Sequence, residues 1–217
     1  GNTGATRRWR MDKQYKPHFI RELKRLMALT LPDFRLTPIP QNHPQRDVFT
    51  GALLFASPVS KTKTVWLWWV PGPGVERYFD VFVGWSPNVD TMPLPEKHEP
   101  QLYLLRGPHH DFPAAALHLR QIQGESAVCG YTIPTPWDQV SVIKPMAPGR
   151  EHVAAMERAQ SEASALTNAQ RTAAVVGTLE NVLAALQQVV PDFTAAAQTA
   201  LHCPQQPGPG GQPPRAG

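Results

Sequence analysis

The chain has 217 residues, of which 41% are hydrophobic and 18% are charged, so it is long enough to bury one sizeable core. It contains no run of 18 uninterrupted apolar residues and no charged-then-apolar leader, which argues against a membrane span and a secretory signal. Two cysteines are too few for a disulfide scaffold. These features predict a soluble cytoplasmic protein with two free thiols.

Positive charge is concentrated near the N-terminus. Residues 1–27 carry eight basic and two acidic side chains, a net charge of +6, whereas the whole chain carries +4. The remaining residues therefore sum to −2, and the high pI belongs to the leading segment. Clustered basic residues are one expected property of a nucleic-acid-binding protein.

Composition divides the chain into three parts. Residues 1–11 form a basic leader without periodicity, which we expect to be flexible. Residues 204–217 are rich in proline and glycine and hold too few apolar side chains to pack, so they are expected to be disordered. Residues 12–203 are predicted to fold as a single domain.

The first expected element is a helix. Apolar side chains recur at helical spacing from Tyr15 to Met27. The helix is expected to end at Leu31, because the residue before a proline is disfavoured in the α region. A proline-punctuated loop follows at 37–45.

Three strands are expected next, at 47–58, 64–70 and 76–85. The last two flank the sequence Pro-Gly-Pro-Gly at 71–74 and are predicted to form a hairpin. This hairpin holds four of the chain's six tryptophans, so its register decides which indole rings face the core.

A four-residue loop predicts that Val70 lies opposite Val75. One face of the hairpin is then almost purely apolar and is predicted to be core: Trp66, Trp68, Val70, Phe79, Val81, Val83 and Trp85. The other face is half apolar and half charged: Val65, Leu67, Trp69, Glu76, Tyr78, Asp80 and Phe82. Whether a helix covers this second face or leaves it exposed stays open at this point.

Further elements are expected after a proline-rich loop at 86–100. Residues 101–107 are compatible with a strand or a short helix, and residues 112–122 favour a short helix. The segments 126–133 and 139–143 have the composition of strands.

The C-terminal part predicts helices. A weak apolar stripe begins at Val153, and a strong one runs from Val175 to Val190, where Pro191 is expected to break the helix before a final short one. The element order indicates an α+β fold, with an antiparallel sheet of about four to six strands flanked by an N-terminal helix and C-terminal helices. This layout is similar to that of many small bacterial binding proteins, including toxin-neutralising immunity proteins, and implies a binding role.

No catalytic, cofactor-binding or metal-ligating motif stands out. His109, His110 and Asp111 are adjacent, but no CxxC, HxH or HExxH pattern accompanies them. Glu76 and Asp80 lie on one strand face and would form a general acid–base pair only if they lined a cleft. We therefore predict no cofactor and no metal, and an enzyme with its site near the His-His-Asp loop is the weakest alternative.

The leading hypothesis is a non-enzymatic module that binds a protein partner. An exposed apolar patch with charged edges is typical of such a surface, and Trp and Tyr are common anchors in protein interfaces. The predicted binding residues are Leu67, Trp69, Tyr78 and Phe82.

The alternative hypothesis is association with nucleic acid through the basic N-terminal segment. Lys and Arg side chains would contact phosphates, and binding would weaken steeply with salt. The predicted contact residues are Arg7, Arg8, Arg10, Arg21, Lys24 and Arg25.

Overall fold

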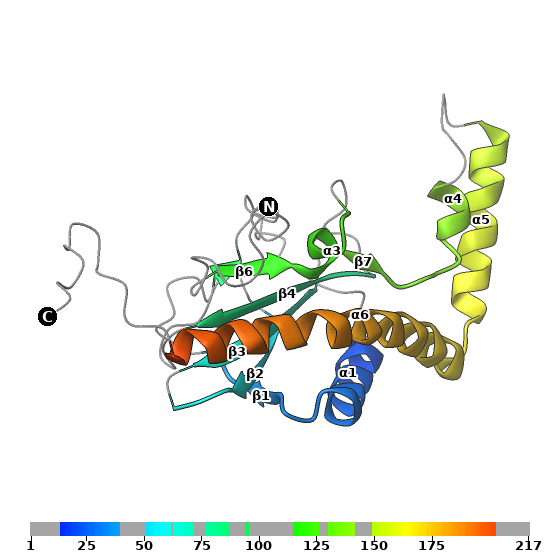
Figure 1. The fold of residues 1–217 in the computed structure, drawn as a ribbon. Coiled ribbons are helices and arrows are strands. Elements are labelled where there is room, and N and C mark those ends of the chain that lie inside the picture. Colours follow the sequence, from blue (N-terminus) through cyan, green and yellow to red (C-terminus); the bar gives the residue numbers. More distant parts are fainter. Residues whose placement is uncertain are drawn as a thin grey trace, which may run out of the picture.

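Two long helices pack against one face of a largely antiparallel sheet in the computed structural model (Figure 1). The α+β fold expected from the sequence, with its N-terminal helix and C-terminal helices, is therefore confirmed. The residues that the structure describes are 14–39, 51–61, 63–71, 77–86, 94–95, 115–125, 130–141 and 149–202.

The described strands form one sheet in the order β1-β2-β3-β4-β6-β5, and β7 also pairs with β4. All pairs are antiparallel except the short β5–β6 pair. The central strands β3 and β4 are the longest. The bounds are β1 Arg35–Thr37, β2 Leu53–Pro58, β3 Thr64–Pro71, β4 Tyr78–Ser86, β5 Leu94–Pro95, β6 Ala115–His118 and β7 Tyr131–Thr132.

The helices differ in their relation to this sheet. In Figure 1, α6 runs across the sheet with α1 beside its first half, whereas α4 and α5 stand away from the strands. Among the described elements, α1 packs extensively on α6, and α6 packs on β3 and β4. The bounds are α1 Lys16–Thr30, α3 Leu119–Ile122, α4 Asp138–Ser141, α5 Arg150–Ala165 and α6 Asn168–His202.

The first helix forms where the apolar periodicity predicts it. Pro17 lies in the first turn, where its missing N–H removes no intrahelical hydrogen bond. Phe19, Leu23 and Met27 are buried against the rest of the fold. The helix ends at Thr30, and the N–H of the capping residue Leu31 donates to the carbonyl of Met27 at 2.9 Å.

The long helix α6 continues through Pro191 to His202, so the predicted break at this proline was wrong. Proline in a helix interior removes one hydrogen bond and crowds the preceding turn. Its ring is exposed, and the buried side keeps its phase across it, from Val189 and Val190 to Phe193 and Ala197. Packing against the sheet therefore outweighs the local cost of the proline.

Residues Asn168–Gln198 of α6 form a helix whose length and apolar composition would suffice to cross a bilayer. Length and composition are weak evidence, since the core helix of a soluble protein passes the same criterion. In this fold Leu179, Leu183 and Leu186 of α6 are fully or almost fully buried in the main hydrophobic cluster. The apolar side of α6 is therefore already used by the fold.

The hairpin formed by β3 and β4 has a different register from the predicted one. Trp69 pairs with Val81 and Val70 with Asp80, whereas the predicted four-residue loop placed Val70 opposite Val75. An odd shift in register moves every side chain of one strand to the other face relative to its neighbour. Trp69 consequently shares a face with Val81 and Phe79, and Trp68 with Phe82.

The sheet carries an apolar layer on each face. On the helix-covered face, residues of β3 and β4 join α1 and α6 in the main core, which includes Val65, Leu67, Trp69, Phe79, Val81, Val83 and Trp85. On the opposite face a second buried cluster consists of Leu54, Ala56, Trp66, Trp68, Val70 and Phe82. β3 is therefore buried along its whole length.

Two smaller elements also differ from expectation. Residues 115–118 form a strand, β6, rather than part of a helix, because they pair with β4, and the helix α3 follows. Residues Asp138–Ser141 form a helical turn instead of a strand. The expected elements at 101–107 and both cysteines lie outside the described residues, as do the leader and the tail.

Candidate interaction surface

The four residues predicted to bind a partner do not share a face. Leu67 and Trp69 are fully buried beneath the helices, at 0% exposure each. Tyr78 and Phe82 lie on the opposite face of the sheet, since alternate residues of β4 point to opposite sides. Phe82 is buried in the second cluster, and Tyr78 is half-buried. The sheet thus offers no continuous surface made of these side chains.

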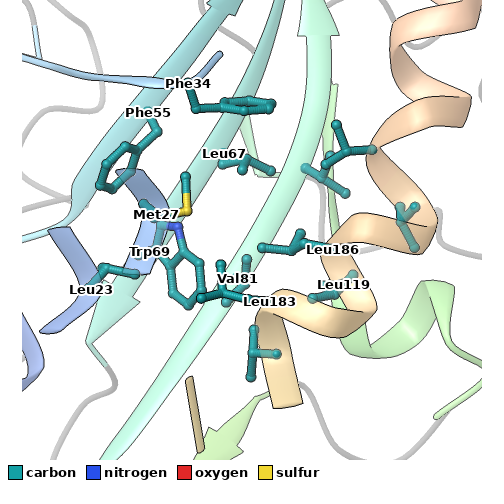
Figure 2. Close-up of a cluster of buried hydrophobic side chains, with 14 of the residues drawn as sticks. Leu23, Met27, Phe34, Phe55, Leu67, Trp69, Val81, Leu119, Leu183 and Leu186 are labelled. Carbon is teal, nitrogen blue, oxygen red and sulfur yellow. The ribbon is translucent and has the colours of Figure 1, made fainter. Parts of the chain in front are cut away.

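Trp69 is a central residue of the main core. Figure 2 shows its indole among Leu23 and Met27 of α1, Val81 of β4 and Leu183 of α6. Its ring stacks on Phe79 with the centroids 6.0 Å apart. The indole Nε1 is buried and has no hydrogen-bond partner among the residues that the structure describes, a polar cost that the apolar packing of the ring must offset.

The basic residues of α1 are partly neutralised within the helix. Glu22 accepts hydrogen bonds from Arg25 at 2.7 Å and from Arg21 at 3.4 Å. The hydrogen bond from Arg25, helped by Arg21, holds the pKa of the Glu22 carboxyl below its usual value against the effect of desolvation. Lys24 is exposed. The other predicted phosphate contacts, at positions 7, 8 and 10, lie outside the described residues.

A buried acid–base pair lies on the second face of the sheet. Asp80 of β4 and His118 of β6 are each 7% exposed, and the Asp80 Oδ2 lies 2.8 Å from the His118 Nδ1. The Asp80 Oδ1 accepts the N–H of Val81 at 2.8 Å. The His118 ring contacts Phe82 with a centroid separation of 4.3 Å. Asp80 therefore contacts His118, and Glu76, the other member of the acid–base pair considered from the sequence, lies outside the described residues.

The pair is built by sheet register. Phe82 and His118 are cross-strand neighbours, which brings His118 beside Asp80, two residues along β4 on the same face. Asp80 is the one acidic residue on an otherwise apolar or small face of β4, and this was the only sequence signal for a buried role. Burial raises the pKa of the Asp80 carboxyl, while the hydrogen bond and charge of His118 act in the opposite direction.

Replacing Asp80 by Asn should remove a pH-dependent part of stability. A carboxyl whose pKa is raised by folding favours the folded state fully below its unfolded value, about 3.8, and loses this contribution as pH rises through the folded value. We expect the wild type to lose stability relative to Asp80→Asn as pH rises from that value. Urea denaturation of both proteins across the acidic to neutral range measures this difference, and a difference that grows in the reverse direction would contradict it.

The described residues contain no group of three or more His, Cys, Asp or Glu side chains placed to hold a metal ion. The sequence His109-His110-Asp111 lies outside them, so the third hypothesis gains no support from the described part. Among the histidines that the structure describes, His118 forms an ion pair or hydrogen bond with a carboxylate, that of Asp80. This pair alone does not define a reaction.

A different apolar surface lies on α5. Among the described elements α5 packs extensively only against the single turn of α4. Ala155 and Ala159 of α5 are buried, whereas Val153 is 48% exposed and Met156 42% exposed. The sequence has a weak apolar stripe that begins at Val153, but its spacing does not show which of its members face solvent. Val153 and Met156 are called the α5 patch below.

Polar contacts fix α4 between the sheet and α5. Arg77, at the start of β4, forms an ion pair with Asp138 and a hydrogen bond to Thr135. The Asp138 Oδ2 also accepts the N–H of Thr135 at 2.9 Å. On its other side, Gln139 donates to Glu162 of α5. A short polar chain thus links α5 to the start of the central strand β4.

Hydrogen bonds at the junction of α5 and α6 separate the two helices. The Thr167 Oγ1 accepts the N–H of Gln170 at 3.1 Å, and the Gln170 Oε1 accepts the N–H of Thr167 at 2.8 Å. This reciprocal pair is a capping box, which begins a new helix at this point. The chain therefore turns between Leu166 and Asn168, and α5 stands away from the sheet in Figure 1.

Comparison with known proteins identifies no relative: no family model, no curated protein and no solved structure matches the chain. The chain is an α+β protein with two exposed large hydrophobic side chains on a helix outside its core.

Proposed function

We propose that the protein is a non-enzymatic interaction module that binds a protein partner through the α5 patch. The observation that supports this is the exposure of Val153 and Met156 on a helix that, among the described elements, packs extensively only on α4. Most helical stability in proteins comes from packing of an apolar side. A partner that covers the patch supplies this packing.

The proposal replaces the residues first predicted while keeping the class of function. Leu67 and Trp69 are buried in the core, so we place the partner contacts on α5 instead of on the hairpin. A cytoplasmic location and a bacterial binding role belong to the same proposal. Association with nucleic acid receives less support, because Arg21 and Arg25 are engaged by Glu22.

The test is a capture experiment with the full chain immobilised. A double variant, Val153→Ser/Met156→Ser, should retain far less bound protein than the wild type from a cell extract, because two apolar contacts are lost. Leu29→Ser is the matched control, since Leu29 is exposed on α1, away from the patch. Loss of capture with Leu29→Ser but not with the double variant would refute the proposal, and loss on nuclease treatment would favour the nucleic-acid alternative.

A further inference from the structure

On the exposed side of α5, a basic and an acidic residue lie about one helical turn before and after Val153. Arg150 lies three residues before Val153, and Glu157 lies four residues after it, so the three side chains form one row along the helix. Arg150 and Glu157 are both exposed. Met156 lies beside this row. From its N-terminal end, the row therefore consists of a positive, an apolar and a negative side chain.

We propose that a second copy of this chain docks on the α5 patch, with the two α5 helices antiparallel. This inference rests on the proposed function and names its partner. A two-fold axis passing near Val153 brings Arg150 of each copy opposite Glu157 of the other. Such an interface is isologous, since the same surface is used on both sides. A row with charges of one sign would not be self-complementary in this way.

The same two-fold axis also brings the apolar side chains of the two copies into contact. Val153 lies beside Val153 of the second copy, and each Met156 lies within one turn of the opposing Val153. The two exposed large hydrophobic side chains of α5 are therefore covered together. Antiparallel helices also bring opposite ends of the two macrodipoles together.

The placement of α5 determines where the two sheets would lie in this arrangement. In Figure 1 the helix begins at its end far from the sheet and ends beside the start of α6. Antiparallel pairing through the first two turns consequently places the two sheets at opposite ends of the helix pair. The contact spans only about two turns on each copy, so it belongs to the small, weak class of interfaces.

Sedimentation velocity over a concentration series tests the proposal. The full-length wild type should show a reversible monomer–dimer equilibrium, and Val153→Ser/Met156→Ser should remain monomeric. Arg150→Glu and Glu157→Arg should each weaken self-association roughly tenfold, because each places like charges opposite one another. A mixture of these two variants should recover dimers, since every opposed pair then has opposite signs. Circular dichroism confirms that each variant is folded.

A wild type that stays monomeric at every concentration would overturn the inference, as would a mixture that associates no better than the separate variants. The two levels of the proposal remain distinguishable. If the wild type is monomeric but the capture of a different protein is lost in Val153→Ser/Met156→Ser, the interaction function stands and self-association is rejected. If neither assay responds to this double variant, both proposals are rejected.

Discussion

Trp69→Ala should lower the free energy of unfolding by about 3–5 kcal/mol, the usual range for removing a large aromatic side chain from a core. The indole is fully buried and lies between the sheet and the helices α1 and α6 (Figure 2). Its removal therefore leaves a cavity that solvent does not reach. Urea denaturation followed by circular dichroism measures the loss.

Leu29→Ala provides the control for this experiment. Leu29 is 70% exposed on α1, and surface substitutions of this kind usually change stability by less than about 0.5 kcal/mol. If Trp69→Ala behaves like Leu29→Ala, Trp69 is not part of the core. The hairpin would then return as the candidate binding surface.

Gly130→Ala should destabilise the fold by about 2–3 kcal/mol, within the range for overpacking in a filled interior. A methyl group at this position would collide with the ring of Tyr78 and lie 2.6 Å from the backbone oxygen of Phe79. The tyrosine ring can rotate, but the carbonyl is held in β4, which pairs with β7 at this point. Chemical denaturation of the purified variant measures the effect.

Gly177→Ala is the matched substitution with the opposite expected sign. A Cβ at position 177 of α6 meets no atom within 4 Å, and alanine in a helix interior is more favourable than glycine by about 0.5–1 kcal/mol. The pair separates a steric effect from the general effect of adding a methyl group. Equal responses at the two positions would contradict the close approach of Gly130 to β4.

Elements with a clear periodicity were predictable from the sequence. The apolar side of α1 and the strong stripe of α6 are both buried as expected. The alternation in β4 correctly predicted that Phe79, Val81 and Val83 form a core face. In these segments only one face is continuously apolar, so a single orientation satisfies the hydrophobic effect.

The register of β3 could not be predicted in the same way, because both of its faces are apolar. Trp66 and Trp68 are as suitable for a core as Leu67 and Trp69, so the pattern does not choose between the two registers. The choice came from an assumed loop length, and the observed pairing differs from it. A strand with two apolar faces obtains its register from its neighbours.

The local sequence pattern also did not predict structure that depends on contacts between residues far apart in the chain. Residues 115–118 pair with β4, and the helix past Pro191 is maintained by buried Phe193. The Asp80–His118 contact joins residues 38 positions apart and depends on that same β4–β6 pairing. The exposure of Val153 depends on which side of α5 is covered by α4. Each of these features is a tertiary property that no short window contains.

The two apolar faces of β3 have a consequence for cooperativity. Trp68 and Trp69 are adjacent in the chain, yet their side chains belong to different buried clusters. Separating β3 from its neighbours therefore disrupts both clusters at once, and neither layer can melt while the other persists. The sheet, α1 and α6 form one cooperative folding unit, whereas α5, which relies on α4, can open locally at lower free energy.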